Sequence, residues 1–537
     1  MELGKIYHMG REEKADLILN RQAMASHTFV TGSTGTGKSN AVYHLLDEIT
    51  KDGRTSFLVV EPAKGEYKNV FGSRADVKVF GTNPRETPLL RINPFAFPQN
   101  IHILEHIDRL VEIFNACWPM YAAMPAVLKD AIERSYQKVG WDLRNSESEK
   151  GVFPTFFDLL DILPGVIEES HYSKDTQSDY VGALCTRVKS LTNGIYGSVF
   201  CAEDALSDAE LFDCNVVVDL SRVGSMETKS LLMGILVMKL QEYRMCGSEM
   251  NSRLRHVTVL EEAHNLLRKT SAEQPQEGAN LQGKSVEMLA NAIAEMRTYG
   301  EGFIIADQAP GLLDMSVIRN TNTKIILRLP DEEDRKLVGK SAALKEAQID
   351  ELSKLPLGVA AVYQNEWPEA VLCKIEAYPM PENAVYHKPS KMPHEINAEF
   401  VFGQLAAGKE LEPLSVSEME QLKRWLKRHE MMLKPEDGRY LEQVFAGGEL
   451  DVAKTRKAVF DFFGGISTVV DYCAAAEKSF TPRKEFLEQL QGQYGLKAAA
   501  ADWVLNSVIS MGMSLNPDAK AVDNLRTNFE QQGGRVL

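Results

Sequence analysis

Short runs of apolar and β-branched residues recur before residue 330 and are separated by stretches with helical spacing. The runs are Thr28 to Thr31, Phe57 to Val60, Val77 to Phe80, Val216 to Leu220, Val257 to Leu260, Phe303 to Ala306 and Lys324 to Leu327. Runs without polar alternation are typical of strands buried on both faces of a mostly parallel sheet. Between them, residues such as Ile103, Ile107 and Leu110 have the spacing of an amphipathic helix. The alternation predicts an α/β fold with a doubly wound core.

The same patterns divide the chain into regions. Residues 100–205 are largely helical and separate strands that one crossover would otherwise join, so we interpret them as a helical insertion in a core domain of residues 1–378. A proline-rich segment, residues 379–395, is predicted to be a linker. Beyond it, residues 396–537 have almost wholly helical patterns and are expected to form an accessory domain.

Composition narrows the class of protein. The 537 residues are 44% hydrophobic, which is enough for two or three domains. No run approaches the roughly 20 apolar residues of a membrane helix, and the first residues lack a signal-peptide core. The seven cysteines are scattered without a C-x-x-C pair, so neither a disulfide framework nor a zinc site is indicated. We expect a cytoplasmic protein without a membrane partner.

A glycine-rich segment follows the first predicted strand. Gly32, Ser33, Thr34, Gly35, Thr36, Gly37, Lys38 and Ser39 match the phosphate-loop pattern G-x-x-x-x-G-K-[ST]. In such a loop, backbone N–H groups converge on phosphates at the start of a helix, here expected to open at Asn40. Lys38 is expected to reach the β and γ phosphates, and the Ser39 hydroxyl to bind Mg²⁺. The segment from Gly32 to Asn40 therefore predicts binding of ATP with Mg²⁺.

A phosphate loop alone predicts nucleotide binding, and hydrolysis also needs an acidic element. Two acidic residues follow the strand from Val257 to Leu260. Glu261 is expected at the strand's carboxyl end beside the magnesium, where related motifs usually have aspartate. Glu262 follows it and is predicted to be the general base that polarises the attacking water.

Two further strand ends carry polar residues whose roles stay open. Gln308 follows the strand from Phe303 to Ala306 and fits a sensor of the γ-phosphate, or a side chain that caps the next turn. Glu61 ends the strand from Phe57 to Val60, where it fits either positioning of water or a turn.

Phosphoryl transfer places negative charge on the γ-phosphate, and ring ATPases commonly neutralise it with an arginine from a neighbouring subunit. Arg297 is our choice for this catalytic arginine over Arg319 and Arg328, because it lies just before the strand that ends at Gln308. An arginine favoured by the end of a helix is the alternative. The polar stretch from Arg268 to Lys284 fits a pore loop or a plain surface loop.

Taken together, these motifs resemble the HerA branch of the FtsK–HerA motor superfamily over roughly residues 4 to 378. The segments that carry the resemblance are His27 to Ser39, Glu61 to Tyr67, Asn93 to Phe95, His106 to Leu110, Trp118 to Tyr121, Glu261 to His264 and Ala306 to Gln308. The resemblance implies a RecA-like ATPase core in a homohexameric ring that threads double-stranded DNA, with ATP sites between subunits. The formal net charge of −15 is compatible with a few cations on inner loops of such a ring.

The resemblance also implies partners. HerA-like proteins often work with a nuclease such as NurA, or with other effectors of anti-phage defence, for example a sirtuin-like NADase. Relatives usually carry an N-terminal β-barrel before the core, and here the core pattern begins almost at residue 1. A DNA translocase is the first hypothesis. An ATP-regulated hexameric scaffold that activates an effector is the second, and a metabolic kinase is a weaker third.

Overall fold

The computed structural model describes residues 1–121, 123–148, 151–202, 205–270, 281–380, 385–387, 401, 405, 435–445, 451–476, 481–494 and 498–536. The chain divides into two compact units, Met1–Ser390 and Lys391–Leu537. Most of the proline-rich segment predicted as a linker, residues 379–395, lies outside the described residues, as does the part of the predicted pore loop at 271–280.

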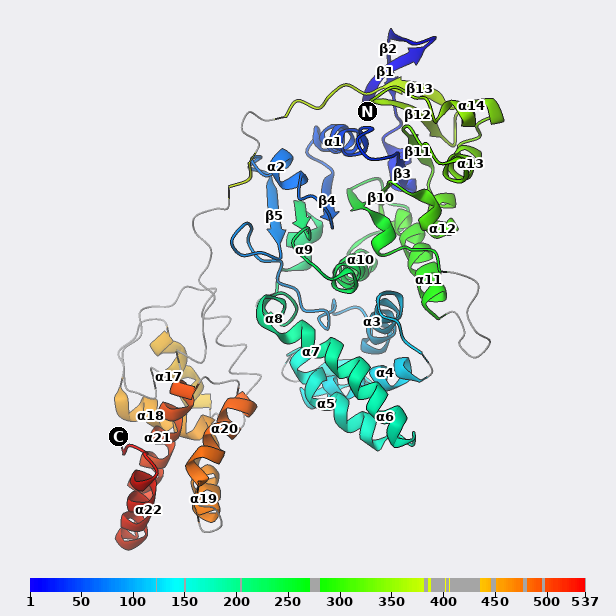
Figure 1. The fold of residues 1–537 in the computed structure, drawn as a ribbon. Coiled ribbons are helices and arrows are strands. Elements are labelled where there is room, and N and C mark those ends of the chain that lie inside the picture. Colours follow the sequence, from blue (N-terminus) through cyan, green and yellow to red (C-terminus); the bar gives the residue numbers. More distant parts are fainter. Residues whose placement is uncertain are drawn as a thin grey trace. The chain divides into compact units, whose positions relative to one another are not determined.

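The first unit is built on an eleven-stranded sheet in the order β2-β1-β13-β12-β11-β3-β10-β9-β4-β8-β5 (Figure 1). Its strands are β1 (Glu2–His8), β2 (Arg11–Ile18), β3 (Thr28–Thr31), β4 (Ser56–Glu61), β5 (Val77–Gly81), β8 (Asn215–Asp219), β9 (His256–Glu261), β10 (Glu301–Asp307), β11 (Thr323–Ile326), β12 (Val359–Gln364) and β13 (Val371–Lys374). From β11 to β5 all neighbours are parallel. The strands β12, β13, β1 and β2 continue the sheet antiparallel. The predicted α/β fold with a mostly parallel sheet is confirmed.

Side chains of the central strands alternate between two apolar cores, one on each face of the sheet. In β4, Phe57 and Val59 face one core while Leu58 and Val60 face the other, as the two-residue period of a strand requires. Helices α1 (Lys38–Thr50) and α2 (Tyr67–Phe71) cover the first face. Helices α3 (Ile103–Cys117), α10 (Met226–Gly247) and α11 (Leu281–Glu295) cover the second.

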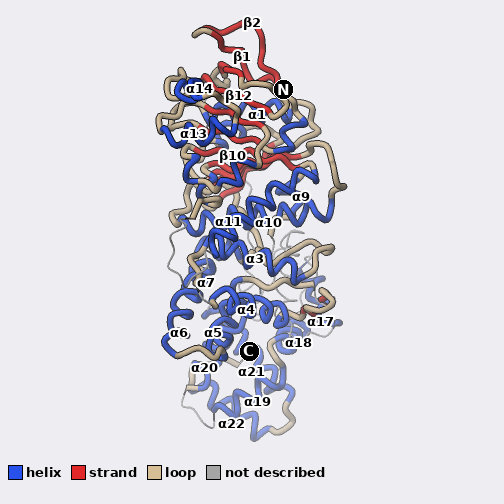
Figure 2. Tube along the Cα trace, turned by 90° about the vertical axis from the view of Figure 1, so that its right-hand side faces the viewer, coloured by secondary structure: helices blue, strands red, loops and turns tan. Residues whose placement is uncertain are grey.

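Further helices complete the first unit. They are α4 (Met124–Lys138), α5 (Phe156–Glu169), α6 (Lys174–Tyr180), α7 (Thr186–Thr192), α8 (Gly194–Phe200), α9 (Asp208–Phe212), α12 (Met315–Arg319), α13 (Glu332–Ser341) and α14 (Glu346–Glu351), with a small hairpin of β6 (Trp141–Asp142) and β7 (Glu147–Ser148). Figures 1 and 2 show α4 to α7 beyond α3, farther from the sheet than α10 and α11. Helix α3 therefore joins the inserted helices to the helix layer of the core.

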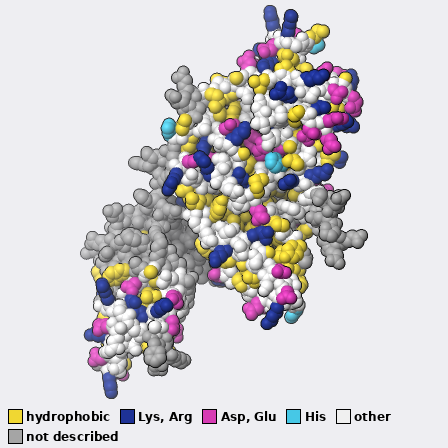
Figure 3. Space-filling view, viewed as in Figure 1, with side chains coloured by type: hydrophobic (Ala, Val, Ile, Leu, Met, Phe, Trp, Pro, Cys, Tyr) yellow, Lys and Arg dark blue, Asp and Glu magenta, His cyan; other side chains and the backbone are white. Residues whose placement is uncertain are grey.

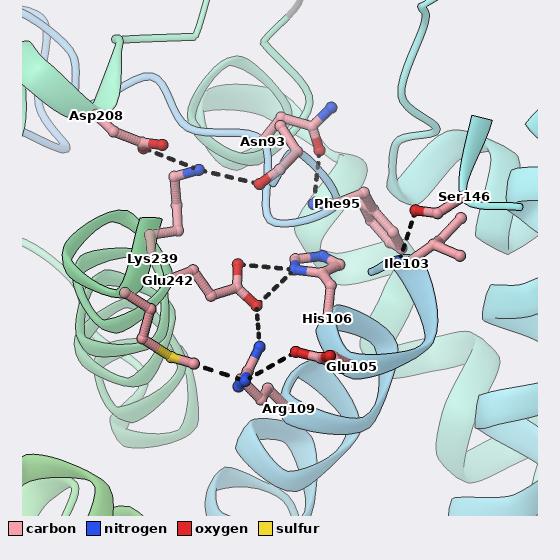
Figure 4. A network of polar contacts seen from close by, with 12 residues as sticks. Asn93, Phe95, Ile103, Glu105, His106, Arg109, Ser146, Asp208, Lys239 and Glu242 are labelled. Atoms are coloured by element: carbon pink, nitrogen blue, oxygen red, sulfur yellow. Dashed lines mark hydrogen bonds and ion pairs between the residues drawn. The ribbon is translucent and has the colours of Figure 1, made fainter. Parts of the chain in front are cut away.

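A buried polar network fastens α3 to α10 (Figure 4). Glu242 on α10 is fully buried, and its carboxylate lies 3.0 Å from Nδ1 of the buried His106 and 3.4 Å from the guanidinium of Arg109. Burial alone would raise the pKa of Glu242, but His106 and Arg109 hold it below its usual value. One turn earlier, Lys239 pairs with Asp208 at 3.1 Å. The charges are thus compensated inside an otherwise apolar layer.

The second unit is helical, with α17 (Pro435–Phe445), α18 (Val452–Phe462), α19 (Gly465–Ala476), α20 (Pro482–Tyr494), α21 (Ala498–Leu515) and α22 (Ala519–Gln531) around their own apolar core. The predicted C-terminal helical region is therefore present. Among the described residues, no single helix is long and apolar enough to cross a membrane, although α18 and α19, bent by 67° at their junction, reach that length and composition as a pair.

Candidate nucleotide-binding and catalytic site

The phosphate loop connects the end of β3 to the start of α1. Gly35 and Gly37 have φ of +77° and +110°, a region that residues with a Cβ rarely adopt. Gly32 packs so closely that a Cβ there would lie 2.7 Å from Leu327. The helix begins at Lys38, two residues before the predicted Asn40, so the loop's last N–H groups already belong to the first turn. This arrangement is an anion site built from backbone donors at a helix N-terminus.

Lys38 is held inside the loop that it serves. Its Nζ donates to the carbonyl of Gly32 at 2.9 Å, and only 9% of the residue is exposed. Burial lowers the pKa of Lys38, while the nearby carboxylates of Glu262 and Glu261 act in the opposite direction. The ammonium group therefore lies among the phosphate loop and both acids, where a bound polyphosphate would accept its hydrogen bonds.

Glu262 stands at the carboxyl end of β9 in an unusual backbone conformation. Its φ of +45° and ψ of +52° are left-handed, which costs a residue with a side chain roughly 1–3 kcal/mol and is most common at functional sites. Its Oε2 atom is buried and has no hydrogen-bond partner. Burial raises the pKa of Glu262 and nearby Asp307 adds to the effect, whereas Lys38 opposes it. A carboxylate with a free oxygen is placed to accept a proton from water.

Glu261, the preceding residue, is the last residue of β9 and is almost fully buried. The Tyr67 hydroxyl donates a hydrogen bond to its Oε1 atom. Burial raises the pKa of Glu261 to about 7, although the bond from Tyr67 and the charge of Lys38 oppose the rise. The second oxygen remains for a metal. Tyr67 was not identified from the sequence, because only the fold brings α2 against the end of β9.

Gln308 and Asp307 lie at the end of β10, the strand between β3 and β9. The Gln308 side chain accepts a hydrogen bond of 2.8 Å from Thr34 of the phosphate loop, so the predicted sensor touches the loop directly. Asp307 is fully buried and accepts from both the backbone N–H and Nδ1 of His264, at 2.8 and 2.9 Å. His264 Nδ1 in turn lies 3.6 Å from Glu262. This chain of contacts was not predicted.

The side-chain oxygens at the carboxyl edge of the sheet suit magnesium, which prefers oxygen ligands. Ser39 lies in the first turn of α1. The carboxylates of Glu261 and Glu262 lie near its neighbour Lys38. A second cluster, formed by Glu262, His264 and Asp307, also has ligand atoms within 4.8 Å of one another. Its histidine nitrogen is already bonded to Asp307, so the oxygen set with Ser39 fits the implied metal better.

Two of the sequence-predicted side chains have other partners. Both oxygens of Glu61 accept backbone N–H groups, from Glu66 at 2.8 Å and from Tyr67 at 3.1 Å, which is the turn role considered for it. Burial raises the pKa of Glu61 to about 8. The Asn40 amide bonds the backbone of residues 376 and 378 instead of pointing at the phosphate loop.

The structure does not bring Arg297 to the other predicted site residues of its own chain. Arg297 is exposed in the turn before β10, at the amino end of the strand, whereas Gln308 and Glu262 lie at carboxyl ends. Arg319, at the end of α12, precedes β11 and lies at the same amino edge. Arg328 follows β11, and its backbone carbonyl accepts from Ser33 N–H at 3.0 Å. Arg328 is therefore the alternative arginine next to the chain's own phosphate loop.

Comparisons with known proteins also point to an ATPase with a phosphate loop. Residues 1–193 match the family model described as helicase HerA, central domain. The DNA double-strand break repair helicases HerA of Sulfolobus acidocaldarius and Sulfurisphaera tokodaii are 25% and 23% identical, over 70% of this chain and 69% of each relative. The VirB4 structure of Thermoanaerobacter pseudethanolicus shares the fold, with a TM-score of 0.54 and 19% identity over 71% of this chain and 96% of VirB4. The chain is therefore similar to HerA-like P-loop ATPases, and residues 1–193 carry the match to the HerA central domain.

Proposed function

We propose that this protein is a motor that uses ATP hydrolysis to move double-stranded DNA through a homohexameric ring. The observation that carries the proposal is the convergence of three neighbouring strands on one site. β3, β10 and β9 bring the phosphate loop, Gln308 and the Glu261–Glu262 pair to one edge of the sheet. The relatives named as DNA double-strand break repair helicases support the nucleic-acid substrate.

The site residues have different roles in ATP hydrolysis. Magnesium, held by Ser39 and Glu261, would neutralise charge on the β and γ phosphates. Lys38 exchanges its bond to the Gly32 carbonyl for the phosphates, and Glu262 takes a proton from the attacking water through its free oxygen. Gln308 is bonded to Thr34, so loss of the γ-phosphate is transmitted from the loop to β10.

In a ring, a neighbouring subunit can supply the arginine that the structure does not bring to the chain's own ATP site. Arg297 is exposed at the amino edge of the sheet, away from its own phosphate loop, a position compatible with reaching the ATP site of a neighbouring subunit. The proposal therefore assigns Arg297 to catalysis in trans, with the ATP site shared between two subunits.

The charge distribution favours enclosed DNA over DNA on the outer surface. Figure 3 shows Lys and Arg side chains interspersed with Asp and Glu on the described face of the first unit. With a net charge of −15, this mixed surface offers a duplex little attraction. Contacts would come from cations on loops that line the ring, and would be made to phosphates without regard to sequence.

A motor of this kind would act with an effector. A NurA-like nuclease, or a sirtuin-like NADase in anti-phage defence, is the class of partner that we propose. The deciding experiment measures ATPase rate with and without double-stranded DNA. We expect stimulation by DNA of any sequence that weakens steeply as salt rises, because phosphate contacts release counterions. A rate that is indifferent to DNA but responds to the effector would favour the ATP-regulated scaffold.

A further inference from the structure

Tyr67, the first residue of α2, is bonded through both its backbone and its side chain. Its backbone N–H donates to Oε2 of Glu61 at 3.1 Å, and its hydroxyl donates to Oε1 of Glu261. Glu61 ends β4 and Glu261 ends β9, and these two strands are neighbours in the sheet. Tyr67 therefore connects two adjacent strand ends at the carboxyl edge of the sheet.

Aromatic packing fixes the ring of Tyr67 in this position. The residue is only 1% exposed. The Tyr43 ring on α1 packs edge-on against it, with 4.9 Å between the ring centroids, and Phe71 stacks on it from one turn later on α2, at 6.5 Å. A ring enclosed at the density of a protein core keeps one rotamer, so the direction of the Tyr67 hydroxyl is set by the packing of α1 and α2.

Tyr43 links this packing to the helix that follows the phosphate loop. It lies four residues after Ser39 on α1, and side chains at that spacing share one face of a helix. Burial raises the pKa of Tyr43, and a side-chain hydrogen bond with Ser39 acts in the opposite direction. Ser39 and Glu261 are the two residues proposed to hold Mg²⁺. Each thus has a tyrosine bonded to it, and the two tyrosine rings pack against each other.

The length of the Glu261 side chain explains why it needs such a partner. Glutamate has one methylene more than the aspartate usual in related motifs, and therefore one more rotatable bond that must be ordered when a metal binds. The Tyr67 hydroxyl orders this side chain through Oε1 and leaves Oε2 for the ion. Loss of a hydrogen-bond partner of a metal-binding carboxylate typically costs about 10- to 100-fold in metal affinity or activity.

We infer that Tyr67 is a positioning residue of the magnesium site, which holds the Glu261 carboxylate in the orientation that binds the ion, with Tyr43 as its support. The inference rests on the proposed function in one respect, the assignment of Glu261 to the metal. Tyr67 acts through Glu261, because its hydroxyl is bonded to that carboxylate. A hydrogen bond that only stabilised the fold would leave metal affinity unchanged.

The test measures metal affinity, with Mn²⁺ as the probe and electron paramagnetic resonance of free Mn²⁺ as the readout, on the full-length protein with ADP bound. Tyr67→Phe removes the hydroxyl and keeps the ring. We expect the Mn²⁺ dissociation constant to rise by about 10- to 100-fold. The affinity for ADP in the presence of EDTA, measured by calorimetry, should not change, because the phosphate loop binds the phosphates without the metal.

Tyr136→Phe is the matched control. Tyr136 on α4 is also fully buried, and its hydroxyl donates to the Phe95 carbonyl instead of a site residue. This variant loses a buried hydrogen bond of the same kind, and its Mn²⁺ affinity should equal that of the native protein. An equal loss of Mn²⁺ affinity in Tyr136→Phe and Tyr67→Phe would overturn the inference, as would an unchanged affinity in Tyr67→Phe.

Glu261→Asp tests whether Tyr67 acts through Glu261. The shorter side chain withdraws its carboxylate from the Tyr67 hydroxyl, so adding Tyr67→Phe in this background should change Mn²⁺ affinity by less than about threefold, as expected for coupled residues. The full 10- to 100-fold loss in this background would refute the inference, and so would native protein that binds no Mn²⁺ with ADP. These measurements involve neither DNA nor turnover. A lack of stimulation by DNA would therefore refute the motor and leave the role of Tyr67 unaffected.

Discussion

Glu262 combines a free buried oxygen with a backbone conformation that the surrounding fold must enforce. Its neighbour His264 is bonded to the fully buried Asp307, and the backbone N–H of His264 donates to the same carboxylate. Asp307 thus holds the turn that follows Glu262, the residue that we propose as the general base. The phosphate loop, by contrast, needs no such support because its glycines adopt the required angles without a Cβ.

Glu262→Gln keeps the shape of this side chain and removes its ability to accept a proton. We expect normal ATP binding with turnover reduced by roughly 10²- to 10⁴-fold, as for other lost general bases. Steady-state hydrolysis and nucleotide titration measure the two effects. Lys38→Ala is the comparison, because it removes the charge on the phosphates and should abolish hydrolysis while the fold is retained. Native turnover by Glu262→Gln would assign the base to another residue.

Glu61 gives the protein a pH dependence of stability with a definite sign. Its pKa in the folded protein is about 8, against an ordinary value of 4.5. An acid with a raised pKa favours the folded state when protonated, so its contribution is full below pH 4.5 and is lost as pH rises toward 8. We expect the free energy of unfolding to fall across this interval. Glu61→Gln should flatten the profile in urea denaturation at several pH values. An identical slope in the variant would refute the assignment.

The sequence predicts those site residues whose geometry is local. The phosphate loop, Glu261 and Glu262 are short motifs at strand ends, and their neighbours along the chain determine their shape. Tyr67 could not be found in this way, because it meets Glu261 across 194 positions of sequence. The partnership of Asp307 with His264 likewise depends on β10 lying next to β9, which no local pattern specifies.

At the scale of elements, the strands of the parallel part of the sheet were predictable and the antiparallel strands were not. All seven predicted strands are present, and all of them except the edge strand β5 are largely buried on both faces. β2 was missed, since every residue in it except Leu17 is exposed and its sequence is mostly charged. β12 and β13 were also not predicted, and they lie between β11 and β1 in the sheet.

The α3–α10 contact yields a prediction at this scale. Glu242→Ala leaves His106 and Arg109 without their buried partner, and removal of one member of a buried ion pair costs about 3–5 kcal/mol. We expect that loss in the free energy of unfolding from urea denaturation. Glu105→Ala removes a carboxylate that is 57% exposed and lies 3.4 Å from the same Arg109, and should cost less than about 1 kcal/mol. Equal effects of the two variants would show that the network does not fasten the insertion.

At the scale of the whole molecule, the position of Arg297 predicts complementation between subunits. Arg297→Ala should bind nucleotide normally and lose about a thousandfold or more in turnover, as when an arginine finger is removed. Mixed with Glu262→Gln, which is also inactive, it should regain activity, because some interfaces then pair an intact Glu262 with an intact Arg297. Activity is measured across mixing ratios.

The control for this experiment is native mass spectrometry that confirms mixed rings. If mixed rings form and no ratio recovers activity, Arg297 does not act between subunits. Arg328, beside the chain's own phosphate loop, then becomes the better candidate. The sequence patterns predict the fold class of each unit. They do not predict how subunits assemble, because assembly depends on surface residues without a periodic pattern.

The sheet order has a consequence for synthesis on the ribosome. Among the described strands, the β1–β2 hairpin joins the rest of the sheet through β13, so this partner of the hairpin is missing until residues 371–374 have been translated. At about 5–20 residues per second, that interval is roughly 20 to 70 seconds. During it the nascent chain exposes the unpaired edge of β1, and the many charged side chains of β2 reduce the chance that this hairpin pairs with another chain.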